Sequence, residues 1–184
     1  MTHPMLGLFA AVTIASASMA PDAAYARNEK AWDDASNIGE GLLLAAAFGI
    51  EAGKEDWNGG LQTLASTTSA FAATQALKQA FPEIRPDRNG DDSFPSGHTA
   101  VSFAAAASLQ NRYGWKVGLP AHVAASFVGL ARVEARRHFW YDVLAGAAIG
   151  EATGLLITNR QNQSVQVIPW GDAHGGGASV IAHF

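Results

Sequence analysis

Five segments of helical length, rich in alanine and leucine, dominate the sequence and are separated by glycine, proline or Asn-Gly. Apolar side chains run through each segment, and the breakers end one helix before the next begins. A length of 184 residues suits one domain. The sequence therefore predicts an all-α fold, a single bundle of about five to six helices within residues 27–160. We expect helices at 34–51, 61–81, 98–113, 117–136 and 141–159.

Residues 161–184 differ from this helical part. Two short β-like runs, SVQVIPWG and ASVIAHF, flank the glycine-rich stretch DAHGGG. Such runs around a glycine-rich turn are typical of a hairpin. We expect a short β-like tail after the helical domain, either as a small hairpin or as a loose segment.

The N-terminus has the pattern of an export signal. Residues 5–17, MLGLFAAVTIASA, form an apolar run that is too short for a comfortable membrane span. Pro21 and then Ala24-Tyr25-Ala26 follow, and A-x-A is typical of a cleavage site. No Lys or Arg precedes the run, so an ordinary amphipathic or disordered N-terminus is the alternative. We expect residues 1–26 to be a signal peptide. The protein would then be exported to the cell envelope, to the periplasm or to a membrane with the active site facing the periplasm.

Composition excludes several classes of protein. The formal net charge of −4 is unlike that of a nucleic-acid-binding protein, which usually carries a basic face. There is no cysteine, so disulfides, thiol chemistry, iron–sulfur clusters and cysteine-ligated zinc are excluded.

The helical segments leave the relation to a membrane open. None is a clean apolar run of 18 or more residues, because polar residues interrupt them at Glu40, Lys78, His122 and Glu151. One interpretation is a soluble helical bundle with alanine-lined contacts. The other is a short membrane protein whose polar residues face inward.

Candidate chemistry begins with PSGH at residues 95–98. His98 lies in the first turn of an expected helix, where backbone N–H groups have no helical partner. Gly97 lets an anion approach this backbone closely, so the helix start is suited to an anion. Alternatively, Ser96 is only an N-cap.

Three cations stand in segments that are otherwise poor in charge. Lys78 and Arg85 belong to KQAFPEIRP, and Arg132 belongs to ARVEARRHFWYD. Three cations beside a helix N-terminus suit a tetrahedral oxyanion such as phosphate. Taken singly, each could be a solvated surface charge, with Lys78 favoured at a helix C-terminus.

The third cluster also contains a histidine and a carboxylate at helical spacing. Asp142 follows His138 by four residues, which places the two side chains on one face of a helix. A carboxylate there can hold the imidazole N–H and favour the charge that the ring gains as a nucleophile. The alternative is a surface pair that contributes little.

Together, K-x6-RP, PSGH and R-x5-H-x3-D resemble the motifs of the type 2 phosphatidic-acid phosphatases. Their superfamily also contains bacterial non-specific acid phosphatases and vanadium haloperoxidases. The resemblance covers residues 78–142 and departs from the family at two points. Ala131 stands where a serine usually precedes the arginine, which removes one hydroxyl from the expected phosphate pocket. The eight-residue linker between Pro86 and Pro95 is shorter than usual.

The resemblance implies a phosphohistidine mechanism. His138 would attack phosphorus while Asp142 orients its ring. His98 would act as general acid on the leaving oxygen and then as base on the incoming water. The non-bridging oxygens would be bound by Lys78, Arg85, Arg132, Ser96 and the backbone N–H of Gly97. No metal ion or other cofactor is implied.

We therefore expect an exported, metal-independent phosphatase acting on phosphate monoesters or lipid (pyro)phosphates, with vanadate as an inhibitor. Its partner would be a phosphorylated small molecule or lipid, and we expect no nucleic acid. If the chain is a short membrane protein whose polar residues face inward, it would also associate with a membrane. No pattern indicates an oligomeric state. One alternative is a vanadate-dependent haloperoxidase with vanadate as its cofactor. Another is a non-catalytic phosphate- or lipid-binding envelope protein, which Ala131 slightly favours.

Overall fold

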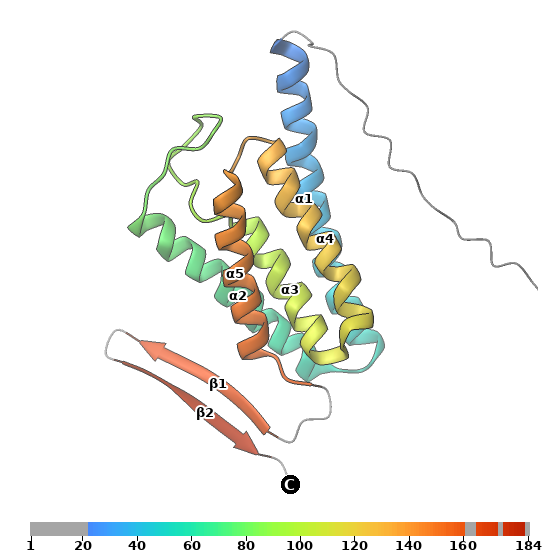
Figure 1. Ribbon diagram of the computed structural model, residues 1–184. Coiled ribbons are helices and arrows are strands. Elements are labelled where there is room, and N and C mark those ends of the chain that lie inside the picture. The colour runs from blue at the N-terminus through green and yellow to red at the C-terminus, as the bar shows by residue number, and fades with distance from the viewer. Residues whose placement is uncertain (1–21, 161–164, 173–174, 183–184) are drawn as a thin grey trace, which may run out of the picture.

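The structure is a computed structural model that describes residues 22–160, 165–172 and 175–182. Five helices and one hairpin follow one another along the chain (Figure 1). They are α1 (Asp22–Gly53), α2 (Trp57–Ala80), α3 (Gly97–Tyr113), α4 (Trp115–Glu134), α5 (Trp140–Ile157), β1 (Val165–Asp172) and β2 (Gly175–Ala182). The predicted all-α bundle is confirmed, although its first helix begins at Asp22 rather than at residue 34. Most of the expected signal peptide, residues 1–21, lies outside the described residues.

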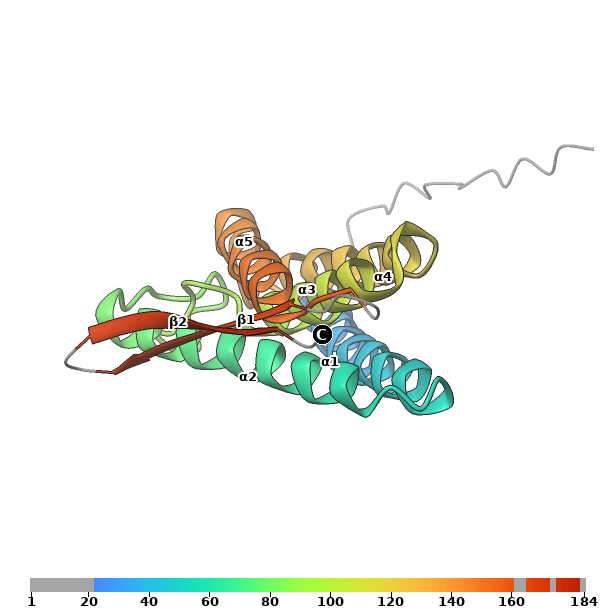
Figure 2. The same ribbon diagram turned by 90° about the horizontal axis from the view of Figure 1, so that it is seen from below.

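Helix α3 is the centre of the bundle. It contacts each of the other four helices, and Figure 2 shows it between α5 and α4 on one side and α2 and α1 on the other. Its sequence explains this position, because a run of alanines lets neighbouring backbones approach closely. Five of these alanines are fully buried: Ala100, Ala104, Ala105, Ala106 and Ala107.

Glycines on α5 bring that helix against the backbone of α3. Gly146, Gly150 and Gly154 recur every four residues and so share one helix face. A Cβ atom at Gly146 would lie 2.4 Å from the carbonyl oxygen of Ser96, and one at Gly150 would lie 2.3 Å from that of Ala100. These positions accept no side chain, so the start of α5 stays close to the start of α3.

A buried ion pair ties the opposite ends of the helices together. Arg112 of α3 donates two hydrogen bonds to the carboxylate of Asp56, and the hydroxyl of Tyr113 donates a third at 2.7 Å. Asp56 also caps α2 by accepting from the backbone N–H of Gly59 at 3.0 Å. The hydrogen bonds from Arg112 are the main reason that the pKa of Asp56 falls to about 2.

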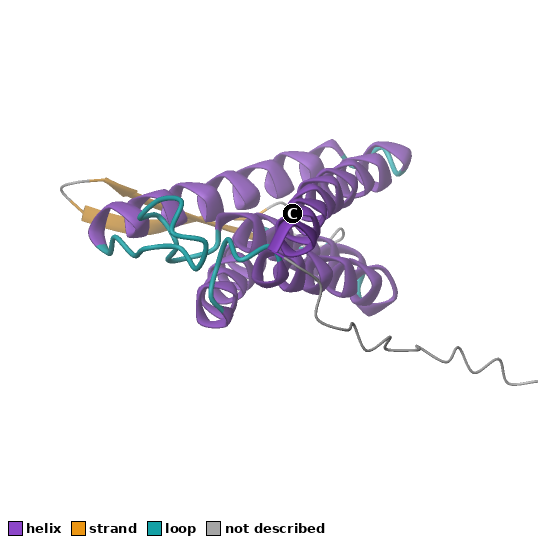
Figure 3. Cartoon of the chain, turned by 90° about the horizontal axis from the view of Figure 1, so that it is seen from above, coloured by secondary structure: helices purple, strands orange, loops and turns teal. Residues whose placement is uncertain are grey.

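The connections that carry the predicted motifs lie at one end of the bundle. The α2–α3 connection and the turn between α4 and α5 meet at the upper end in Figure 1, and Figure 3 shows these loops from above. The α2–α3 connection is held by backbone hydrogen bonds, from Glu83 to Asp91, from Ser93 to Glu83 and from Arg85 to Gly90. This end is therefore ordered by the chain itself, and it positions the charged residues described below.

The C-terminal strands form the hairpin that was one of the two expected outcomes. β1 and β2 pair in antiparallel register from Val165 opposite Ala182 to Asp172 opposite Gly175. Within residues 22–160, which hold all the described helices, none is both long and apolar enough to cross a bilayer.

Gly150→Ala tests the close approach of α5 to α3. The added methyl group meets the backbone of Ala100 and Ala104, which cannot move aside cheaply, so we expect a destabilisation of about 1–3 kcal/mol or more. Gly49→Ala is the matched control: Gly49 lies exposed in α1 with open space around it, so the same change should stabilise the helix by up to about 1 kcal/mol. Urea unfolding of both variants measures the difference, and equal stabilities would contradict the packing described.

Candidate active site

One cavity of about 350 Å³ gathers most of the predicted site residues. Its wall is built from the second half of α2, the α2–α3 connection, the start of α3, the end of α4, the turn between α4 and α5, and one residue of α1. Six of the eight predicted residues line it: Lys78, Arg85, Gly97, His98, Arg132 and His138. The remaining lining residues are Glu40, Phe71, Gln75, Asp92 and Val101.

His138 follows the end of α4 and is almost fully buried. Its Nδ1 lies 2.7 Å from the backbone carbonyl oxygen of Ser93. A carbonyl oxygen only accepts hydrogen bonds, so Nδ1 of the neutral ring carries the proton. Nε2 is then the nitrogen that keeps a lone pair, and it is free to act at the cavity. Burial, and the positive charges of Arg132 and Lys78, lower the pKa of His138 and so favour this neutral form.

Asp142 holds this arrangement in a different way from the one expected. Its Oδ2 is 3.7 Å from Nδ1 of His138, which is longer than a hydrogen bond, because the Ser93 carbonyl already accepts that proton. Oδ2 instead accepts from the hydroxyl of Ser93 at 2.6 Å and from the backbone N–H of Phe139 at 2.9 Å. Burial would raise the pKa of Asp142, but the adjacent His138 ring and these two donors lower it.

Ser93 is therefore a central residue that sequence reasoning missed. It is fully buried, its carbonyl accepts from His138 and from Nζ of Lys78 at 3.3 Å, and its hydroxyl donates to Asp142. It stands in the loop between two motif blocks, and no spacing rule marks it there. Its position is fixed only by the folded loop.

The three cations are each held on one side by an acceptor. Arg132, at the end of α4, bonds Oδ1 of Asp33 at 2.5 Å and the hydroxyl of Ser36 at 3.1 Å, both on α1. Arg85 pairs with Asp92 at 2.8 Å, and Lys78 donates to the backbone carbonyl of Asp92. Such fixed cations form a preorganised site for the oxygens of an anion.

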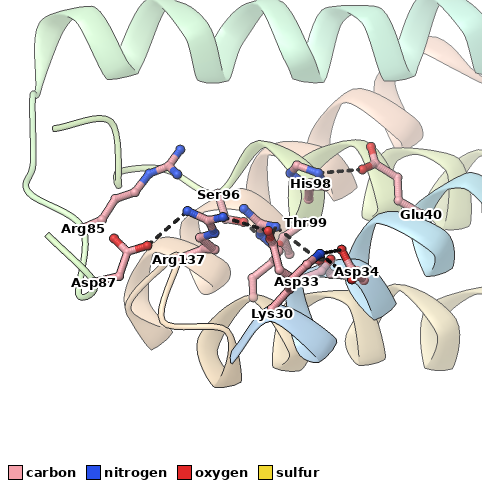
Figure 4. A network of polar contacts seen from close by, with 12 residues as sticks. Lys30, Asp33, Asp34, Glu40, Arg85, Asp87, Ser96, His98, Thr99 and Arg137 are labelled. Carbon is pink, nitrogen blue, oxygen red and sulfur yellow. Dashed lines mark hydrogen bonds and ion pairs between the residues drawn. The ribbon is translucent and has the colours of Figure 1, made fainter. Parts of the chain in front are cut away.

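Asp33 joins this site to the neighbouring surface. Its Oδ2 accepts from Arg137 at 2.8 Å, and Arg137 also reaches Asp87 at 3.1 Å (Figure 4). Burial would raise the pKa of Asp33, but the two arginines bring it below its ordinary value. Sequence reasoning missed this residue as well, because it lies on α1, far along the chain from the motifs.

Ser96 and Gly97 differ in their relation to the cavity. Gly97 lines it, as expected for the start of α3. Ser96 is fully buried, its hydroxyl is paired with that of Thr99 at 2.9 Å, and it is not among the lining residues. Ala131 is also fully buried and outside the lining.

His98 lies at the first turn of α3 and faces the same cavity (Figure 4). Burial, reinforced by the nearby charge of Arg132, lowers the pKa of His98 to about 4. Among the residues that the structure describes, no group of three or more His, Asp or Glu side chains is arranged to hold a metal ion.

Residues 59–166 match the family model of the PAP2 superfamily, and the chain belongs to that superfamily. It is similar to a lipid A 1-phosphatase of Porphyromonas gingivalis, with 34% identity over 118 residues, covering 62% of this chain and 26% of that protein. It is also similar to a lipid A 4'-phosphatase of Helicobacter pylori, with 37% identity over 76 residues, covering 41% of this chain and 38% of that protein. The chain thus spans between a quarter and two fifths of the length of these relatives.

A solved structure has the same fold. The crystal structure of Aquifex aeolicus LpxE superposes with a TM-score of 0.59 at 23% identity, covering 69% of this chain and 82% of that one.

Ser93→Ala tests the link between the α2–α3 connection and Asp142. The change leaves a buried carboxylate with one donor fewer, and we expect a destabilisation of about 1–3 kcal/mol. Ser102→Ala is the matched control, because that buried hydroxyl has no partner among the described residues; its effect should stay below about 1 kcal/mol. Chemical denaturation measures the free energy of unfolding of both variants. Equal losses of stability would show that the hydrogen bond from Ser93 to Asp142 does not stabilise the fold.

Proposed function

We propose that the protein is a metal-independent phosphatase that hydrolyses the phosphate monoester of a lipid through a phosphohistidine intermediate. One observation carries the proposal: His138 is held with Nδ1 protonated, so its Nε2 lone pair is available at a cavity lined by Lys78, Arg85 and Arg132. A nucleophile beside three fixed cations suits attack on a phosphorus atom whose oxygens are bound by those cations.

In the first step, Nε2 of His138 attacks phosphorus and the bond from phosphorus to the leaving oxygen breaks. The ring becomes positively charged at this point, and the Ser93 carbonyl and the carboxylate of Asp142, 3.7 Å away, stabilise that charge. Lys78, Arg85 and Arg132 bind the non-bridging oxygens and offset their negative charge.

His98 completes both halves of the reaction. As an imidazolium it donates a proton to the leaving oxygen, and as a neutral ring it then accepts a proton from the attacking water. The water oxygen bonds to phosphorus, the phosphorus–nitrogen bond breaks, and inorganic phosphate and the free His138 ring are regenerated.

The proposal of a lipid substrate rests on the relatives and on the surface of the bundle. Both relatives described above are named for lipid A phosphatases. Large apolar side chains stand exposed on the helices, and those on α4 recur on one face of that helix; a patch of this kind commonly marks contact with a membrane or another apolar partner. They include Trp57, Leu61, Leu64 and Phe71 on α2 and Leu119, Val123, Phe127 and Leu130 on α4. We propose a location in the cell envelope, reached through the signal peptide, with the active site facing the periplasm.

The two alternatives from the sequence receive less support. The names of the relatives favour a phosphatase over a haloperoxidase. A binding protein without turnover was suggested by Ala131, but that residue stands outside the lining of the cavity, where His98 and His138 are both present.

His138→Asn tests the nucleophile. Asparagine keeps a similar size but forms no phosphohistidine, and we expect release of inorganic phosphate from a lipid phosphate to fall on the order of a thousandfold or more. His122→Asn is the matched control. Nε2 of His122 lies 2.6 Å from Oε1 of Glu151, and neither residue lines the cavity, so this variant should retain activity. A folded His138→Asn variant with unchanged turnover would rule out the mechanism.

Vanadate and chelators test the source of the positive charge. Vanadate resembles the five-coordinate state of phosphorus, so we expect it to inhibit in competition with substrate. EDTA should leave the rate unchanged, because Lys78, Arg85 and Arg132 supply the charge that binds the oxygens. Initial rates with each additive are the measurement, and activity that EDTA abolishes and Mg²⁺ restores would contradict the proposal.

A further inference from the structure

Glu40 is an unexpected residue in an anion-binding cavity. It lies on α1, outside residues 59–166 that the family model matches, and it lines the cavity together with Lys78, Arg85 and Arg132. A carboxylate there repels a bound phosphate unless it is neutralised. The other lining carboxylate, Asp92, is already paired with Arg85, so the position of Glu40 calls for a different explanation.

Glu40 faces His98. Its Oε2 is 3.4 Å from Nε2 of the ring, with side-chain exposures of 18% for Glu40 and 35% for His98 (Figure 4). The two ring nitrogens of an imidazole point in different directions, so Nδ1 is turned away from Glu40. Nδ1 makes no hydrogen bond within residues 22–160, and His98 lines the cavity, so this nitrogen is free for a leaving oxygen.

The charges around the pair favour one shared proton. His98 is surrounded by Arg132 of α4, Arg85 of the α2–α3 connection, His138 before α5 and Asp33 of α1, and Lys78 of α2 lines the same cavity. Burial raises the pKa of Glu40 to about 7, against the opposing effect of Arg132. A pKa of about 4 leaves the His98 ring neutral near pH 7 when no phosphate is bound, and a neutral imidazole is a poor general acid unless a neighbouring group supplies a proton.

We propose that Glu40 is the positioning and proton-holding partner of His98, so that the pair carries one proton and presents His98 as an imidazolium to the leaving oxygen. This inference rests on the phosphatase function proposed above. With one proton the pair is neutral overall, which removes the repulsion between Glu40 and a bound phosphate.

The protons balance through the reaction. When phosphate binds, the shared proton moves from Oε2 of Glu40 to Nε2 of His98, which makes the ring an imidazolium. The Nδ1–H bond then breaks as the O–H bond of the leaving group forms. His98 is then neutral with a lone pair on Nδ1, beside an ionised Glu40. When water attacks the phosphohistidine, Nδ1 takes the water proton and Nε2–H returns its proton to Glu40. The pair ends as it began.

Glu40→Gln tests the pair, because glutamine keeps the shape but holds no transferable proton. We compare kcat/KM for a short alkyl phosphate, whose leaving oxygen needs a proton, with that for p-nitrophenyl phosphate, whose leaving group departs without one. The alkyl phosphate should lose about ten- to a hundredfold and p-nitrophenyl phosphate less than about threefold. Glu134→Gln is the matched control, since Glu134 is exposed at the end of α4, and both of its rates should equal those of the wild type. Equal losses on the two substrates in Glu40→Gln would overturn the inference.

The pH profile and a direct titration distinguish this inference from the function on which it rests. The alkaline limb of kcat/KM for the alkyl phosphate should move to lower pH in Glu40→Gln, because His98 alone loses its proton at lower pH than the pair.

With inorganic phosphate bound, NMR of labelled histidines, assigned with His98→Gln, should show His98 protonated at pH 7 in the wild type and neutral in Glu40→Gln. An unchanged titration would overturn the role of Glu40. Failure of the wild type to release phosphate from either substrate would overturn the phosphatase function, and the NMR result would still decide on the pair.

Discussion

The packing of α5 against α3 is the constraint on which the site depends. The backbone N–H of Ser96, just before α3, donates to the carbonyl oxygen of Asp142 in the first turn of α5 at 3.0 Å. That bond requires the two helix starts to lie together, which the glycine face of α5 permits. With Asp142 held there, its carboxylate binds the hydroxyl of Ser93, and the carbonyl of Ser93 sets the tautomer of His138. The protonation of one ring nitrogen thus depends on the absence of side chains at glycines one to three turns after Asp142 on α5.

Much of this could be predicted from the sequence because it is local. Helices, their breakers and the three motif blocks depend on neighbouring residues, and six of the eight proposed site residues do line one cavity. Ser96 shows the limit of that reasoning. A serine before a helix is equally suited to a ligand and to a neighbouring hydroxyl, and only the fold shows that Thr99 is its partner.

The features that escaped prediction are contacts between distant segments. Glu151 stands out in an apolar helix, yet its partner His122 lies on another helix, and no spacing connects the two. Asp33 and Glu40 reach the site from α1, whose residues follow no motif. Ser93 acts largely through its backbone carbonyl, a group that every residue has and that a sequence pattern therefore cannot mark.

The site is built from two regions of the chain: residues 59–166, which match the superfamily model, and α1, which lies before them. His138 and His98, the proposed nucleophile and general acid, and the three cations come from the segment that the superfamily shares. The acidic residues that hold Arg132 and face His98 come from a helix before that segment. On the proposed mechanism, an exchange of α1 between relatives would leave the reaction in place and alter the pH at which it runs. The first helix is the natural place to look for adaptation of the proposed phosphatase to the acidity of its surroundings.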